Sequence, residues 1–356
     1  MDPVKKLKLF AAQMDIEAAE DTGNTRTTIV PRPQISETST HAPCGQPLSL
    51  NQQAKQDTLG ITQAMMPGGR RINLLKTMMT SACERNCYYC PFRAGRNYRR
   101  ATFRPEEMAN TFMDMHRAGL VDGLFLSSGI IRGGVTSQDK IIATAEILRK
   151  QLQFRGYIHL KIMPGADQDQ VQQTMAVANR VSVNLEAPNT HRLSMLAPKK
   201  IFLEELLRPL KWIEEIRREK PARQNWNGRW ASSTTQFVVG AVGESDLELL
   251  YTTENLFKQL KLSRVYYMAF NPITDTPLEE TPPEDPWRQH RLYQASYLLR
   301  DYGFGLEELP FNDDGKLPLA DDPKLAWAQV NLREMPVELN KAGREMLMKV
   351  PGIGQK

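Results

Sequence analysis

The stretch SACERNCYYCPFRAGRNYRR, residues 81–100, holds three of the four cysteines in this chain of 356 residues. We refer to this stretch as the cysteine loop. Cys83, Cys87 and Cys90 follow the spacing CxxxCxxC, whereas Cys44 lies well upstream in HAPCGQ. A secreted disulfide framework usually spreads more cysteines over a shorter chain, so clustered cysteines in a chain without secretion signals point to metal. The spacing therefore predicts a metal-binding loop.

From about residue 71, short apolar runs alternate strictly with amphipathic stretches. Such alternation predicts six parallel strands joined by right-handed helical crossovers. Six units of this kind can form an open, partial barrel, and active residues in related folds lie at the carboxyl ends of the strands. The expected strands cover residues 72–79, 123–126, 157–163, 181–185, 235–239 and 265–270, and the expected helices cover 105–117, 137–152, 168–178, 201–219, 245–260 and 287–302.

The segments that flank this barrel are polar and less regular. Residues 1–70 are expected to form an irregular N-terminal arm, because residues 22–56 show no sustained periodicity. The barrel is expected over residues 71–305, followed by a C-terminal extension over 306–356 with a polar linker and a final helix at 340–349. The predicted fold class is α/β: a partial (βα)6 barrel with an N-terminal arm and a helical C-terminal extension.

The bulk composition, with 41% apolar and 24% charged residues, is that of an ordinary soluble protein. No apolar stretch approaches the ~20 residues that cross a bilayer, and the N-terminal segment lacks the apolar core of a signal peptide. We therefore expect a cytoplasmic monomer without a membrane partner. The net charge of +5 neither demands nor excludes nucleic acid.

The cysteine spacing suits an iron–sulfur cluster, because three thiolates can bind three irons of a [4Fe–4S] cube and leave the fourth iron open. With an aromatic residue, Tyr89, directly before Cys90, the loop resembles that of the radical S-adenosylmethionine (SAM) superfamily. The resemblance implies that Cys83, Cys87 and Cys90 hold the cluster, that SAM binds the open iron, and that Tyr89 packs against the adenine. It also implies an electron donor such as flavodoxin or ferredoxin. The alternative is a zinc knuckle with Cys44 as the fourth ligand, which a loop within a strand–helix series fits poorly.

The expected second strand ends in LFLSSGIIRGG, and its end resembles the superfamily's GGE-type motif. Ser127, Ser128 and Gly129 occupy that position without the glutamate, so the resemblance implies that hydroxyls and backbone carbonyls take the SAM amino group. The alternative is a tight strand-to-helix turn that needs glycine.

The expected fourth strand, VSVNLEAPN, carries Asn184 and Glu186 two residues apart, and side chains at that spacing share one face of a strand. The resemblance implies that they bind the ribose hydroxyls or the carboxylate of SAM. The alternative is an ion pair with a neighbouring strand, for which Lys161 is a candidate.

Two further segments resemble adenine-binding parts of the superfamily. In TTQFVVGAVGESD, Gly240 and Gly243 match a GxIxGxxE motif that supports the adenine by backbone contacts, while Glu244 is expected to fix the start of the next helix. In VYYMAFNPITDTPL, Met268 lies on the strand that contacts the adenine, although it is equally ordinary as a core residue. These motifs occur in the expected order along the chain.

Five arginines follow the cysteines and alternate with aromatic residues. Arginine beside aromatic side chains suits phosphate and base contacts. The alternative is a solvated loop that pairs with the negative charge of the cluster. The five candidates are Arg93, Arg96, Arg99, Arg100 and Arg104.

The C-terminal stretch NKAGREMLMKVPGIGQK resembles the first helix and hairpin of a helix-hairpin-helix element, incomplete at residue 356. Glycines there, Gly352 and Gly354, let backbone N–H groups approach a DNA phosphate; the alternative is a frayed tail with a turn. Together with the arginines, this stretch resembles a family described as DNA modification or repair radical SAM proteins. The resemblance implies an enzyme that modifies or repairs nucleic acid, DNA before RNA. A small-molecule or protein substrate, or a non-catalytic nucleic-acid-binding metal protein, are the alternatives.

Overall fold

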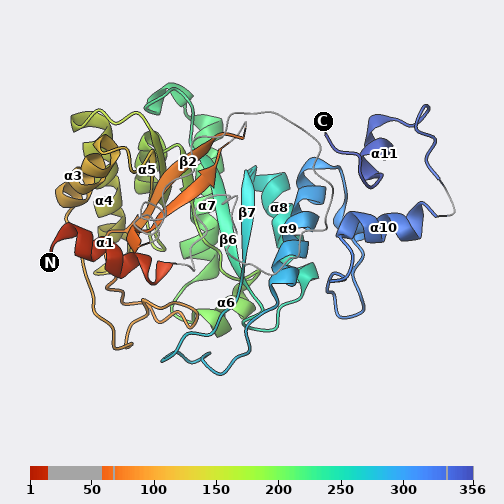
Figure 1. Ribbon diagram of the computed structural model, residues 1–356, viewed down its shortest axis with the longest axis horizontal. Coiled ribbons are helices and arrows are strands. Elements are labelled where there is room, and N and C mark those ends of the chain that lie inside the picture. The colour runs from red at the N-terminus through yellow and green to blue at the C-terminus, as the bar shows by residue number, and fades with distance from the viewer. Residues whose placement is uncertain (15–57, 67–68, 334–335, 356) are drawn as a thin grey trace.

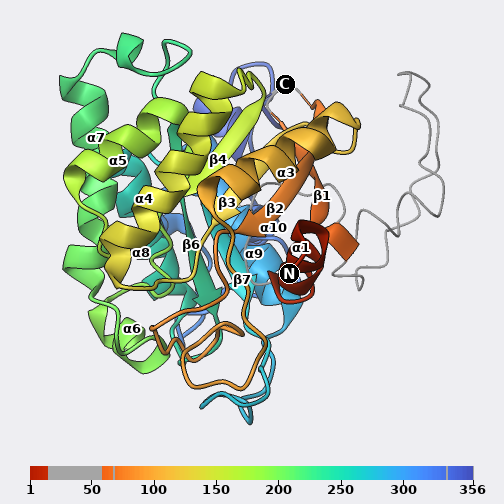
Figure 2. The same ribbon diagram turned by 90° about the vertical axis from the view of Figure 1, so that its left-hand side faces the viewer.

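The computed structural model describes residues 1–14, 58–66, 69–333 and 336–355. In this part of the chain, seven strands form one curled sheet in sequence order, with six helices on its outer side (Figures 1 and 2). Strands β2 to β7 are parallel, which confirms the predicted partial barrel, and β1 pairs antiparallel with β2. The strands are β1 (Ile61–Met65), β2 (Arg71–Met78), β3 (Gly123–Ser127), β4 (Tyr157–Lys161), β5 (Arg180–Ser182), β6 (Ser232–Val239) and β7 (Arg264–Ala269).

The crossover helices lie close to their predicted positions, and the helix after β2 begins at Pro105 as expected. A π-helical segment at residues 147–151 continues the helix that ends at Glu146, and another at residues 202–207 precedes the helix that begins at Arg208. A short additional helix, α6 (Thr190–Leu196), follows β5. The crossover helices are α3 (Pro105–Arg117), α4 (Gly133–Glu146), α5 (Gln168–Val177), α7 (Arg208–Glu219), α8 (Asp246–Leu260) and α9 (Pro286–Asp301).

The two faces of the sheet differ in chemistry. One face packs on the helices: the Thr144 hydroxyl of α4 donates to Met79 Sδ at 3.4 Å, and Tyr267 contacts Thr253 of α8 at 2.7 Å. Residues of the opposite parity line the inner, concave face, where the register places His159 beside Phe125. This concave face is rich in polar side chains. A binding site at the carboxyl ends of the strands would be lined by this face.

The N-terminal segment, expected to be an irregular arm, contains a helix and a strand. Helix α1 (Pro3–Ala11) is capped by Asp2, whose carboxylate accepts from Lys5 N at 3.2 Å. It buries Phe10 fully, and the Phe10 ring packs edge-on against Phe103 with ring centroids 5.9 Å apart. The remainder of the predicted arm, including Cys44, lies outside the described residues.

The C-terminal extension also holds more structure than predicted. Helix α10 (Pro323–Asn331) occupies part of the expected polar linker and buries Trp327. Helix α11 (Arg344–Lys349) begins four residues later than the predicted helix at 340–349. None of the helices in the described residues has the length and apolar character of a membrane span. The division of the chain at residues 70 and 305 stays a prediction.

Candidate functional site

The cysteine loop leaves the carboxyl end of β2 and is hydrogen bonded to the end of β3. The amide of Met79 donates to Ser127 O at 2.9 Å, and the amide of Gly129 donates to Thr80 O at 2.7 Å. A Cβ atom on Gly129 would lie 2.2 Å from the carbonyl oxygen of Ala82, so this position requires glycine. Gly129 therefore has a packing role, and its contact with SAM stays a prediction.

The three cysteines lie together at the start of the loop, as free thiols, with Cys87 buried and the others partly buried. Burial raises the pKa of Cys90, and the nearby Cys87 raises it further. Within the described part of the chain, no three Cys, His, Asp or Glu side chains are placed to ligate one metal ion. Cluster ligation differs from zinc ligation in this respect, because each thiolate binds a different iron.

The amide of Ile130 supports the fit of a cluster here, since it donates to Cys83 Sγ at 3.4 Å. Hydrogen bonds to the ligating sulfurs are one of the means by which proteins tune such clusters. Cys44, the candidate fourth zinc ligand, is not among the described residues.

Arg100 crosses the cysteine loop and donates to four backbone carbonyls within it. Its guanidinium lies 2.6 Å from Ser81 O, 2.5 Å from Phe92 O, 2.7 Å from Arg93 O and 3.3 Å from Arg96 O. These carbonyls come from both ends of the loop, so the side chain fixes its closed shape. This structural role was not predicted from the sequence.

The other arginine candidates divide between loop contacts and the surface. Arg96 donates to Thr274 O at 3.0 Å and to Pro91 O at 2.9 Å, and so ties the loop to the segment after β7. Arg99 and Arg104 are exposed. The guanidinium of Arg93 lies 5.5 Å from the ring centroid of Tyr88. Nucleic-acid contact stays a prediction for all of these residues.

Beside the cysteines, the structure assembles a buried polar group that includes two predicted residues and one that was missed. Lys200 Nζ lies 3.0 Å from Glu186 Oε1 and 3.0 Å from the Tyr89 hydroxyl. The second carboxylate oxygen of Glu186, Oε2, is buried and has no hydrogen-bond partner. The sequence suggested Lys161 as a candidate ionic partner of Glu186, whereas in the structure Glu186 forms its ion pair with Lys200.

Electrostatics keep Glu186 ionised in this buried setting. Burial by itself would raise the pKa of Glu186, but the charges of Lys200 and Lys161 and the hydrogen bond from Tyr89 lower it below its usual value. The backbone of Glu186 has φ 66°, a left-handed conformation that is uncommon for a residue with a side chain. Its strand was expected to run to residue 185; β5 ends at Ser182, and Glu186 pairs again with Phe237 of β6 as an isolated parallel bridge.

Three further candidates fall near this group, at the carboxyl ends of strands. The register places Ser127 at the end of β3 and Met268 near the end of β7 on the concave face. Asn184 follows β5 and is 8% exposed. Gln236 lies beside Met268, with Nε2 3.8 Å from its sulfur. The fold thus brings these side chains to one rim, whereas the Ser128 hydroxyl is turned to its neighbour, Gly129 O, at 2.7 Å.

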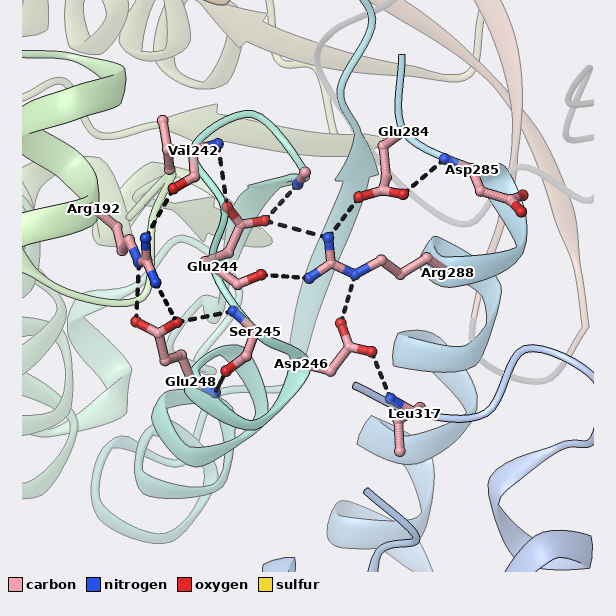
Figure 3. A network of polar contacts seen from close by, with 11 residues as sticks. Arg192, Val242, Glu244, Ser245, Asp246, Glu248, Glu284, Asp285, Arg288 and Leu317 are labelled. Atoms are coloured by element: carbon pink, nitrogen blue, oxygen red, sulfur yellow. Dashed lines mark hydrogen bonds and ion pairs between the residues drawn. The ribbon is translucent and has the colours of Figure 1, made fainter. Parts of the chain in front are cut away.

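The turn between β6 and α8 is closed by a polar network (Figure 3). Gly240 and Gly243 both have left-handed φ angles, 91° and 71°. The Glu244 carboxylate accepts from the amides of Gly240 and of Val242, and Ser245, rather than Glu244, caps α8. The expectation that Glu244 fixes the helix start is therefore wrong in detail, since its carboxylate folds back over the turn.

This turn is also covered from the side of α9. Arg288 donates to Asp246 Oδ1 at 2.7 Å and to Glu284 Oε2 at 2.5 Å (Figure 3). A Cβ on Gly240 would lie 2.2 Å from the Glu284 carboxylate, so the glycine accommodates that side chain. Backbone contact between the Gly240 turn and adenine stays a prediction.

The C-terminal hairpin lies far from the cysteine loop. Gly352 has φ 85°, as a tight turn requires, and a Cβ on Gly354 would lie 3.5 Å from the Tyr302 hydroxyl. Gln355 donates to Asp301 O at 2.8 Å, at the end of α9. Because α9 runs back toward the amino ends of the strands, the hairpin lies at the opposite end of the barrel (Figure 1). The structure does not bring the hairpin glycines and the arginines together.

Comparison with known proteins finds one matching family model and several similar folds. Residues 77–223 match the model described as the radical SAM superfamily, and a search of curated proteins gives no match. Among solved structures, methylornithine synthase aligns at a TM-score of 0.50 and 15% identity over 65% of this chain and 64% of that one. The [FeFe]-hydrogenase maturase HydG aligns at 0.49 and 11% identity, over 64% and 49% of the two chains.

The aligned part thus spans about half to two thirds of the length of those structures. At this identity the likeness shows a shared fold only. The family match covers the cysteine loop and four of the six parallel strands wholly or in part. The matching segment, with its CxxxCxxC loop at the carboxyl end of a parallel strand, is similar to the radical SAM superfamily, whose enzymes use a [4Fe–4S] cluster and SAM.

Proposed function

We propose that this protein cleaves SAM reductively and uses the resulting radical to abstract a hydrogen atom from a substrate. The observation that carries the proposal is the group of three thiols in the cysteine loop, within the segment that matches the superfamily. A [4Fe–4S] cluster held by Cys83, Cys87 and Cys90 would supply the one electron that reductive cleavage of the SAM sulfonium, to methionine and a 5′-deoxyadenosyl radical, requires. The electron comes from a low-potential carrier such as flavodoxin or ferredoxin.

The surrounding side chains have roles that follow from their positions. Cys83, Cys87 and Cys90 are the ligands, and the buried Oε2 of Glu186 is an acceptor for a hydroxyl or ammonium group of SAM. An unpaired buried carboxylate oxygen is unfavourable by itself, which supports a ligand at this point. The buried ring of Tyr89 offers an apolar surface and excludes water from the same place.

The test is formation of 5′-deoxyadenosine. The protein is reconstituted anaerobically with iron and sulfide, reduced with dithionite and incubated with SAM. We expect 5′-deoxyadenosine and methionine in equal amounts, and none from a variant in which the three cysteines are serine. A wild-type protein that holds four irons per chain and yields no 5′-deoxyadenosine would refute the proposal.

For the substrate we propose a nucleic acid, DNA before RNA. Exposed cations that follow the cluster ligands in the chain support an anionic substrate. They are Arg99 and Arg104, whose guanidinium groups can contact phosphate. The hairpin glycines, at the other end of the barrel, are not part of this contact.

Oligonucleotide binding tests the substrate class. Labelled single-stranded and duplex DNA and RNA are titrated with the reconstituted protein at low and moderate salt. Because phosphate contacts release counterions, affinity should fall steeply as salt rises, and a variant with Arg99→Glu and Arg104→Glu should bind more weakly. No binding to any of the four nucleic acids at low salt would overturn the proposal and favour a smaller anionic substrate.

A further inference from the structure

Lys200 is a buried lysine to which neither the sequence motifs nor the family match assigns a role. It follows α6 in the segment LAPKKI, and its side chain is only 9% exposed. Its ammonium contacts two residues from distant parts of the chain, the Tyr89 hydroxyl in the cysteine loop and the Glu186 carboxylate after β5. It also lies 5.6 Å from the centroid of the Tyr89 ring. A buried lysine is rare unless it is paired. Burying Lys200 therefore depends on its contacts with Tyr89 and Glu186, and we ask what these contacts do.

The backbone around Lys200 is fixed to the cysteine loop. The amide of Tyr88 donates to Leu196 O at 2.9 Å, and Arg85 binds both the carbonyl of Lys199 and the Glu205 carboxylate, the latter at 2.5 Å. The segment after α6 and the cysteine loop are therefore held as one unit. Lys200 points inward from this unit, whereas its neighbour Lys199 is exposed.

The ammonium accounts for the orientation of Glu186. One carboxylate oxygen, Oε1, is bound to Lys200, so the other is left as a buried acceptor without a partner. A buried carboxylate needs a nearby positive charge to remain ionised, and Lys200 supplies it. The left-handed backbone of Glu186 is a strained conformation, and such conformations persist where surrounding contacts fix them.

Resting on the function proposed above, we propose that Lys200 is a positioning residue for SAM. It fixes the Tyr89 ring and the Glu186 carboxylate in one arrangement, and so presents Glu186 Oε2 and the aromatic surface to the cofactor. Lys200 acts through these two residues. Its loss should weaken SAM binding while the three cysteine ligands stay in place.

The experiment compares Lys200→Met with Lys200→Arg and with Lys199→Met as the matched control. Equilibrium dialysis measures the Kd for SAM on reconstituted protein with an oxidised cluster, so that no turnover is involved. We expect Lys200→Met to raise Kd by about 10- to 100-fold, the effect of losing hydrogen bonds to charged groups. Lys200→Arg keeps the charge and the donors and should recover much of the affinity, whereas Lys199→Met should bind as wild type does.

A spectroscopic signature and a second variant make the test specific. The EPR spectrum of the reduced cluster should change on SAM addition in wild type at a concentration that leaves the Lys200→Met spectrum unchanged. Tyr89→Phe removes only one contact of Lys200 and should give a smaller rise in Kd, less than additive with Lys200→Met. If Lys200→Met fails to hold iron, the Kd values of Tyr89→Phe and Lys200→Arg for SAM decide whether Lys200 has the positioning role.

The inference and the proposed function can fail separately. If wild type binds no SAM, the proposed function fails. If wild type binds SAM and Lys200→Met, with full iron content, binds it equally well, the function stands and the positioning role is refuted. The positioning role would also be refuted if Tyr89→Phe bound SAM with the wild-type Kd and its EPR spectrum responded to SAM as that of wild type does.

Discussion

Replacing Arg100 with alanine is expected to loosen the cysteine loop and lower the stability of the protein. The guanidinium donates to Ser81 O, Phe92 O, Arg93 O and Arg96 O, three of them at 2.7 Å or less. A hydrogen bond from a charged donor contributes about 1.5–3 kcal/mol, and contributions through one group are less than additive. We therefore expect the free energy of unfolding to fall by about 3–5 kcal/mol, with four carbonyls left without this donor.

Thermal unfolding and iron analysis check this prediction. At roughly 2 cal/mol/K of unfolding entropy per residue, a chain of this length should lose about 4–7 °C in Tm. Iron bound after reconstitution should fall as well, since the loop carries the cluster ligands. Arg99→Ala is the control, because that side chain is exposed and its loss should change stability by less than about 0.5 kcal/mol.

Arg100→Lys separates charge from geometry. A lysine keeps the positive charge, but a single ammonium cannot reach four carbonyls in the way a planar guanidinium does. We expect its stability to lie between those of wild type and Arg100→Ala. Wild-type Tm and iron content in Arg100→Ala would refute the reasoning. Weaker oligonucleotide binding without any loss of stability would assign Arg100 to nucleic acid instead.

Three further predictions concern other parts of the structure. Glu248→Gln should destabilise the protein most above pH 4.5 and progressively less toward pH 2, because hydrogen bonds from Arg192 lower the pKa of Glu248 to about 2; urea unfolding at several pH values measures this. Gly129→Ala should lower stability by about 1–3 kcal/mol, since the new Cβ would meet Ala82 O, and should reduce iron content. Cys87→Ser should abolish 5′-deoxyadenosine formation with little loss of stability of the protein without iron.

Each of these three predictions has a control variant or an outcome that would contradict it. For Glu248, the contribution is present above the unfolded pKa and lost as pH falls through the folded pKa, so a constant difference between the two proteins from pH 6 to pH 2 would contradict it. Gly343→Ala is the control for Gly129→Ala, because its added Cβ meets nothing within 4 Å. Retained activity in Cys87→Ser would exclude Cys87 as a ligand.

Sequence patterns predict most of the barrel because each strand carries apolar residues on the side that packs on the helices and each long helix has a regular apolar face. The short helices were missed because they offer too few turns for a periodic signal. Both α1 and α10 nevertheless begin with aspartate followed by proline, at Asp2 and Asp322, and the aspartate caps the helix in each case. This pair of residues is a start signal that was available in the sequence.

The candidate site is less predictable, because it depends on contacts between distant parts of the chain. The cysteine spacing identifies the metal loop directly, and the alternation of strand residues brings Ser127 and Met268 to one rim. Nothing in the local sequence separates Lys200 from the exposed Lys199 beside it, since its partners lie 111 and 14 residues away. In the same way, only the folded loop shows that Arg100 binds backbone carbonyls.

The central claim is that three cysteines hold a four-iron cluster whose fourth iron binds SAM. Mössbauer spectroscopy of protein reconstituted with ⁵⁷Fe tests it most directly, with spectra recorded before and after addition of SAM. We expect one of the four irons to change its isomer shift when SAM binds, and the other three, each held by a cysteine thiolate, to keep theirs. Four irons that are all unaffected by saturating SAM, or a reconstituted protein that takes up zinc in place of the cluster, would contradict it.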